Sequence, residues 1–219
     1  MLKYPCLVLD HDDTVVQTEK TIGYPYFRDY LEKIRPGTHL SYPEYVACCN
    51  NMVFADMCKQ NWQFTDAELL EEYTGWKAYS LKNIPPLCPG MDKVIRLQKE
   101  LGGMVFVASL STREIIQRDF LHHLGFLPDG IYDNDLPRDR RKPSPYALTD
   151  IMDKHGFTPK DMLVVDDMKL GWQMAQQVGA DTAFAGWSKT AFPQLTAEME
   201  NICNYSFDTA EKLADFLFK

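Results

Sequence analysis

Acidic residues cluster where two apolar runs of the chain end. The run over 6–9 leads into three carboxylates within four residues, and a second run over 162–165 leads into an adjacent pair. Carboxylates this close repel one another unless a cation binds between them. Mg2+ prefers carboxylate, carbonyl and water oxygens, so we expect a magnesium site here. The acidic side chains are Asp10, Asp12, Asp13, Asp166 and Asp167.

The same residues suit the transfer of a phosphoryl group. A carboxylate such as Asp10 can attack phosphorus and form an aspartyl phosphate, which divides one difficult displacement into two easier ones. An acid two positions along, Asp12, suits the proton transfers that both steps require. Ser109, which follows another apolar run, and Lys142 are expected to hold the charged phosphoryl oxygens.

Several of these side chains also have a simpler structural explanation. Asp167 and Ser109 precede helical segments, where aspartate and serine are favoured N-caps. Lys142 lies in a basic run, and such a run is commonly a solvated part of the protein surface. Capping does not require carboxylates at two strand ends together with a lysine, so their co-occurrence favours catalysis.

Buried strands alternate with helices over much of the chain. Continuous apolar runs over 6–9, 104–108 and 162–165 are typical of strands covered on both faces of a parallel sheet. The segments 91–101 and 113–124 have helical spacing and end at glycines. The pattern predicts an α/β domain, with its working residues beyond the carboxyl ends of the strands.

Residues 17–87 interrupt this alternation. They are rich in tyrosine, have helical spacing and contain no convincing buried strand. A connection this long far exceeds the usual loop of about 2–6 residues, so it predicts a separate helical domain. We therefore expect a core domain from 1–16 and 88–219, with a small all-helical lid from 17–87.

Composition narrows the possible partners. The chain has 219 residues and a formal net charge of −8, with no basic stripe of the kind that nucleic acid requires. No signal peptide and no apolar segment near the roughly 20 residues of a membrane span is evident, so we expect a cytoplasmic protein with neither nucleic-acid nor membrane partners. The oligomeric state is left open.

The motifs resemble those of the haloacid dehalogenase superfamily phosphatases. The apolar strand followed by Asp10-His11-Asp12-Asp13-Thr14 is similar to their first motif, Ser109 to the second, Lys142-Pro143 to the lysine motif, and Asp166-Asp167 with Gly171 to the acidic fourth motif. The resemblance implies a Rossmann-like core with a helical cap, a magnesium cofactor and a small phosphate ester as substrate.

The resemblance also assigns roles within the site. It implies that Asp10 is the nucleophile and Asp12 the acid and base. Asp167 becomes the expected further metal ligand, with Asp166 as its helper. Metal contacts would come from the Asp10 carboxylate and the Asp12 backbone carbonyl.

Three positions depart from the commonest family pattern. Leu110 stands where an asparagine is common. Asp13 stands where glycine is usual, and its side chain is expected either to turn outward or to contact metal-bound water. Gly171 stands where many relatives have another acid, a pattern similar to the sugar-phosphate mutase and phosphatase branch.

Two alternatives to a phosphatase remain. A β-phosphoglucomutase-like enzyme would share Asp10 and Asp12 but return the phosphoryl group to a sugar. A non-catalytic receiver-like phospho-acceptor would also use acids, a hydroxyl, a lysine and magnesium, although receivers place their acidic pair on the first strand and lack a lid-sized insert. A dehalogenase is disfavoured, because halide displacement needs no acid at position 12.

Overall fold

The computed structural model describes residues 2–219, which divide into two compact units. The first unit consists of residues 2–17 and 87–219, and the second, here called the inserted unit, of residues 18–86. No helix within residues 2–219 combines the length and the apolar character that crossing a membrane requires.

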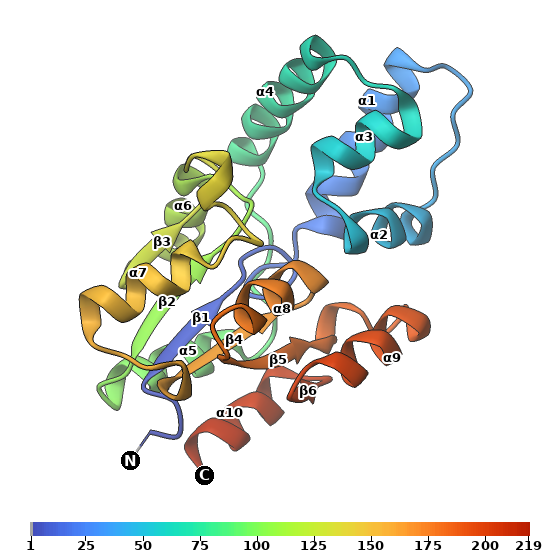
Figure 1. Cartoon of the computed structure of the whole chain (residues 1–219). Coiled ribbons are helices and arrows are strands. Elements are labelled where there is room, and N and C mark those ends of the chain that lie inside the picture. The colour runs from blue at the N-terminus through green and yellow to red at the C-terminus, as the bar shows by residue number, and fades with distance from the viewer. Residues whose placement is uncertain (1) are drawn as a thin grey trace. The chain divides into compact units, whose positions relative to one another are not determined.

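A parallel sheet forms the centre of the first unit. Six strands from the described residues pair in the order β3-β2-β1-β4-β5-β6, so β1 lies between β2 and β4. The order confirms the predicted α/β fold and puts every carboxyl end at the same edge of the sheet (Figure 1). The strands are β1 (Cys6–Leu9), β2 (Met104–Ala108), β3 (Gly130–Tyr132), β4 (Met162–Asp166), β5 (Asp181–Ala185) and β6 (Tyr205–Phe207).

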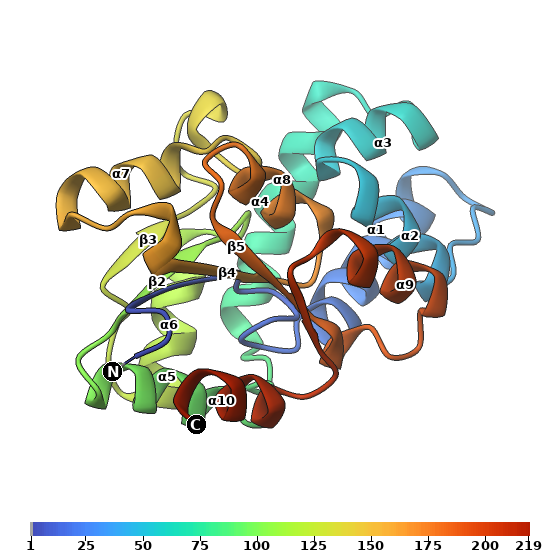
Figure 2. The ribbon, with the colours of Figure 1, turned by 60° about the horizontal axis from the view of Figure 1, so that its bottom comes forward.

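Helices cover both faces of this sheet, which explains why its strands are apolar on both sides. Leu7 and Leu9 on β1 pack into one core cluster with residues of α5, α6 and α10, whereas Cys6 and Val8 pack on the opposite face with residues of α7 and α8. Figure 2 shows these two sets of helices on the two sides of the sheet. The helices of this unit are α5 (Met91–Glu100), α6 (Arg113–Leu124), α7 (Tyr146–His155), α8 (Lys169–Gln176), α9 (Pro193–Ile202) and α10 (Ala210–Phe218).

The inserted unit is helical throughout its regular structure, as its spacing predicts. Its core is aromatic: the Phe27 ring lies 5.0 Å from that of Phe54 and 5.4 Å from that of Trp62 between ring centroids. Its helices are a π-helix (Glu19–Gly23) and α1 (Tyr24–Ile34), α2 (Tyr42–Asn51), α3 (Phe54–Trp62) and α4 (Asp66–Lys82).

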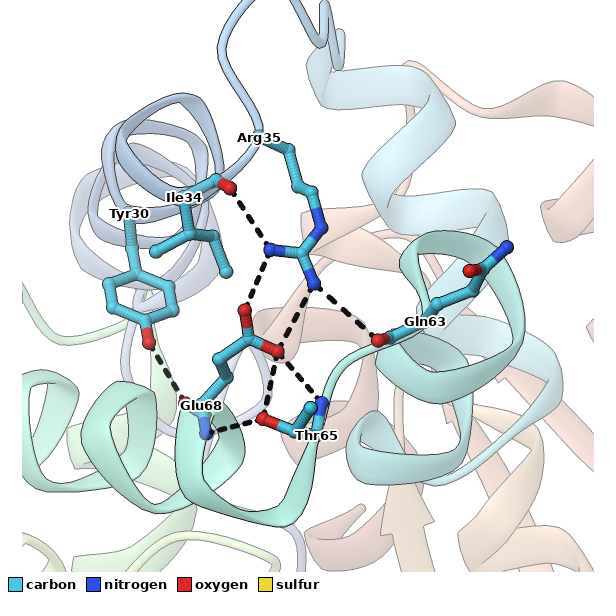
Figure 3. A network of polar contacts seen from close by, with 6 residues as sticks. All are labelled: Tyr30, Ile34, Arg35, Gln63, Thr65 and Glu68. Atoms are coloured by element: carbon cyan, nitrogen blue, oxygen red, sulfur yellow. Dashed lines mark hydrogen bonds and ion pairs between the residues drawn. The ribbon is translucent and has the colours of Figure 1, made fainter.

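A polar network ties the ends of these helices together (Figure 3). Arg35, just after α1, donates to both carboxylate oxygens of Glu68, at 2.7 and 3.1 Å. The same carboxylate accepts from the backbone N–H of Thr65, and the Thr65 hydroxyl accepts from the backbone N–H of Glu68, which completes a capping box at the start of α4. The Arg35 guanidinium is the main reason that the pKa of Glu68 falls to about 2.

Candidate active site

The central strands bring three acidic side chains together, those of Asp10, Asp166 and Asp167, here called the acidic group. Asp10 follows β1 directly, and its backbone N–H donates to the Val165 carbonyl of β4 at 2.9 Å. Asp166 is the last residue of β4, and Asp167 follows it. One carboxylate oxygen from each of Asp10, Asp166 and Asp167 lies within 4.8 Å of the others, and all three residues are buried. Neighbouring parallel strands therefore gather the acids of two separate motifs.

Lys142 neutralises part of this acidic group. Its Nζ donates to Asp10 Oδ1 at 2.8 Å and to Asp166 Oδ2 at 2.5 Å, and its side chain is only 5% exposed. Burial alone would lower the pKa of Lys142, but the charges of Asp10 and Asp166 outweigh burial and hold this pKa above its ordinary value. Lys142 is thus a fixed positive charge beside the Asp10 carboxylate.

A second buried lysine, Lys189, also pairs with an acid of this group. Its Nζ is 2.7 Å from Asp13 Oδ2 and 2.7 Å from Asp167 Oδ2, and its side chain is 0% exposed. The motifs did not predict this residue. The sequence does contain a hint of Lys189, which is the aspartate at position 13 in place of the usual glycine. If that aspartate is buried, its charge needs a basic partner from elsewhere in the chain.

Asp13 adopts a backbone conformation that explains the usual glycine. Its φ is 57°, in the left-handed region that glycine enters most easily and that aspartate tolerates better than most residues. The side chain is buried and bound to Lys189. The expectation that Asp13 turns outward is therefore wrong: its charge is used inside the protein.

The turn that follows Asp10 positions the remaining residues of the first motif. The backbone N–H of Val15 donates to the His11 carbonyl at 2.9 Å, and that of Asp13 donates to the Val16 carbonyl at 2.7 Å. Asp12 lies half-buried within this turn, two residues beyond Asp10. The backbone of this segment is therefore held by hydrogen bonds on both sides of Asp12.

His11 anchors the same turn to α6. Its Nε2 lies 3.0 Å from Asp119 Oδ2, and its ring stacks on Phe120 with centroids 6.2 Å apart. Both His11 and Asp119 are fully buried, and Asp119 also accepts from Arg118. The motif pattern assigned no role to His11, and the structure makes it a support for the segment between the two candidate catalytic acids.

Ser109 lies at the carboxyl end of β2, the strand next to β1. Its side chain is buried, and its hydroxyl oxygen accepts from the backbone N–H of Ser111 at 3.2 Å. This places Ser109 at the same sheet edge as the acidic group.

Gly171 allows Asp166 to pack against α8. A Cβ at position 171 would lie 2.1 Å from Asp166 Oδ2 and 2.5 Å from Asp166 Cβ, which no side chain can occupy without displacing the carboxylate. The absence of a side chain at position 171, where many relatives have an acid, is therefore what leaves room for the Asp166 carboxylate.

The donor set fits a hard divalent cation. Three buried carboxylates converge within one ion's reach, and oxygen ligands of this kind are what Mg2+ takes. Within the described residues, the two buried lysines of the site face four buried carboxylates, which leaves two formal negative charges. A divalent cation would balance this excess.

Comparison with known proteins agrees with this geometry. A family model described as haloacid dehalogenase-like hydrolase matches residues 7–185, so the chain belongs to that family of hydrolases. The match includes every acid and lysine of the site except Lys189, which lies just beyond it.

Solved structures of low sequence identity share the fold over nearly the whole chain. A putative haloacid dehalogenase-like hydrolase from Bacteroides fragilis is 20% identical, with a TM-score of 0.79, 96% of this chain and 100% of that chain covered. A predicted phosphoglycolate phosphatase from Haemophilus somnus is 17% identical, with a TM-score of 0.74 and 99% of both chains covered. CbbY from Rhodobacter sphaeroides, in complex with phosphate, is 15% identical, with a TM-score of 0.74, 97% of this chain and 96% of that chain covered. A separate comparison with curated proteins found no match to this chain.

Proposed function

We propose that the protein is a magnesium-dependent phosphatase that hydrolyses a small-molecule phosphomonoester through an aspartyl phosphate on Asp10. The observation that carries the proposal is the Asp10 carboxylate, held at a strand end by Lys142 within a cluster of buried acids. Membership of the hydrolase family supports it, as does the phosphate bound to the structurally similar CbbY.

The metal site is proposed on the acidic residues described above. The carboxylates of Asp10 and Asp167 and the backbone carbonyl of Asp12 would hold Mg2+, with Asp166 supporting the site through Lys142. When bound, the ion neutralises charge on the phosphoryl oxygens and so favours attack by an anionic group.

Asp10 is assigned as the nucleophile. Its Oδ1 is bound to Lys142, so its other carboxylate oxygen is the one assigned to attack phosphorus. That attack forms an O–P bond and breaks the bond from phosphorus to the ester oxygen. Asp12 gives a proton to the departing oxygen, which leaves as an alcohol.

The second step returns Asp10 to its starting state. Asp12, now ionised, takes a proton from water, and the water oxygen attacks phosphorus. The bond between phosphorus and Asp10 breaks, and inorganic phosphate leaves. Lys142 and the Ser109 hydroxyl are assigned to hold the phosphoryl oxygens through both steps, because their charge and dipole match the charge spread over those oxygens.

The inserted unit is proposed as the cap that selects the substrate. We assign the catalytic core to 1–16 and 88–219 and the cap to 17–87. A helical insert directly after the first motif suits this role, because closure of such a unit would exclude water during attack on phosphorus.

The test is a screen of phosphate esters with wild-type protein and with Asp10→Asn. Sugar phosphates, phosphoglycolate and nucleotides are assayed for released phosphate, with Mg2+ and with a chelator. We expect many turnovers with Mg2+, loss of activity with chelator and no turnover by Asp10→Asn. Asp153→Asn, an exposed aspartate on α7, is the matched control and should keep full activity.

Two results would contradict the proposal. Wild-type turnover by Asp10→Asn would remove the nucleophile assignment. Uptake of a single phosphate per chain, without further release, would instead support a receiver-like phospho-acceptor.

A further inference from the structure

Lys189 reaches the acidic group from a part of the chain that carries none of the motifs. It follows the short 3-10 helix Gly186–Ser188, directly after β5. Its backbone N–H donates to the Gly186 carbonyl at 3.0 Å, and its own carbonyl accepts from Phe192 N and from the Thr196 hydroxyl. The backbone of Lys189 is therefore fixed on both sides, and its ammonium is held in place.

The Lys189 ammonium pairs with one carboxylate that belongs to the candidate ion site and with one that does not. Asp167 is one of the three acids whose oxygens converge on the candidate ion site. Asp13 is not a member of that group, and it binds the same ammonium. Lys189 Nζ lies 2.7 Å from an oxygen of each carboxylate, and its side chain is 0% exposed, so these two ion pairs hold its positive charge at the site.

We propose that Lys189 and Asp13 form a charge-matched pair that sets the affinity of the site for a divalent cation. The Lys189 charge lowers the affinity, because it already neutralises part of Asp167. The Asp13 charge raises the affinity again by neutralising part of Lys189. This inference rests on the proposed metal site and adds two residues that control its strength without being ligands.

The proposal predicts opposite effects for the two halves of the pair. Lys189→Met removes a positive charge next to the site, so the divalent ion should bind more tightly, by about tenfold or more, on a Coulomb estimate for a unit charge and a divalent ion a few ångströms apart. Asp13→Asn removes a negative charge and should weaken binding by a similar factor. The double variant restores the original net charge and should bind within about threefold of wild type.

A purely structural role predicts a different pattern. If the pair only holds the Asp167 carboxylate in position, each single variant loosens the site and both weaken binding. The sign of the Lys189→Met effect therefore separates control by charge from simple support.

The experiment measures ion binding and not activity. Metal-free full-length protein is titrated with Mg2+ and with Mn2+ by calorimetry, and circular dichroism checks that each variant is folded. Lys154→Met is the control, because this lysine pairs with Asp150 on the surface of α7 and its side chain is 62% exposed. Its affinity should equal that of wild type.

The outcomes distinguish this inference from the proposed function. Tighter binding by Lys189→Met, weaker binding by Asp13→Asn and recovery in the double variant would support it. Weaker binding by both single variants, or a double variant weaker than either, would overturn it while leaving the metal site intact. If one single variant does not fold, the other single variant and the double variant still decide the sign. Wild-type protein that binds neither ion would refute the metal site itself.

Discussion

Lys142→Met is the sharpest test of how the active-site charges are balanced. The substitution keeps an unbranched side chain of similar length but removes the ammonium that lies between Asp10 and Asp166. The oxygens of these two carboxylates lie within 4.8 Å of each other. At that separation, with an effective dielectric constant of about 20, the repulsion between two unit charges is about 3 kcal/mol.

The expected loss of stability follows from this repulsion. Breaking a buried ion pair by removing one partner costs roughly 3–5 kcal/mol, which agrees with the Coulomb figure. We therefore expect the free energy of unfolding of Lys142→Met to fall by about 3–5 kcal/mol at pH 7.5 in chelator. With an m-value of about 3 kcal/mol per molar urea, the unfolding midpoint should move down by about 1 M or more.

The assay is urea denaturation followed by circular dichroism, with Lys154→Met as the control. Loss of that exposed ion pair should change the free energy of unfolding by at most about 0.5 kcal/mol. Adding Mg2+ should narrow the gap between Lys142→Met and wild type, because a bound cation takes over part of the lost neutralisation. If the free energy of unfolding of Lys142→Met in chelator lies within about 0.5 kcal/mol of the wild-type value, the Lys142 charge does not stabilise the Asp10 and Asp166 carboxylates as argued.

Three further substitutions test other parts of the molecule. Asp12→Asn should lower phosphate release by about 10^2 to 10^4-fold, the usual contribution of a positioned acid and base, and a steady-state assay beside circular dichroism shows whether the fold is kept. Gly171→Ala should displace the Asp166 carboxylate and cost about 1–3 kcal/mol of unfolding free energy in urea, and an unchanged midpoint would contradict the steric argument. Glu72, buried in the inserted unit, has its pKa raised by burial from 4.5 to about 8, so charging it costs stability progressively as the pH rises from about 4.5 to 8. Glu72→Gln should therefore be no less stable than wild type at pH 4.5 but more stable at pH 8.5, by roughly 3–5 kcal/mol, and equal pH profiles would show that Glu72 is not desolvated.

Much of the fold follows from local patterns in the sequence. Short runs apolar at every position, such as 6–9 and 162–165, suit strands covered on both faces, and the structure has strands there. Helical spacing closed by Gly125 likewise predicts α6, whose C-cap glycine has a φ of 80°. The last strand, β6, was not predicted, because it has only three residues and none is fully buried.

Part of the candidate site also follows from sequence, because of the geometry of parallel sheets. Residues directly after adjacent parallel strands must lie at one edge, so Asp10 and Asp166 are expected to meet once their strands are recognised. The strand order that makes β1 and β4 neighbours confirms that requirement. The catalytic roles of these residues stay predictions that the variants above will test.

Sequence by itself determined the fold class, the helical insert and the edge of the sheet where the acids gather. Only the tertiary structure decided that Asp13 turns inward and that Lys189, 176 positions away, neutralises it together with Asp167. The physical reason is the separation along the sequence of the residues in contact. Strand and helix patterns arise from contacts a few residues apart, whereas the choice of partner for a buried charge depends on how distant turns pack at the end of the sheet.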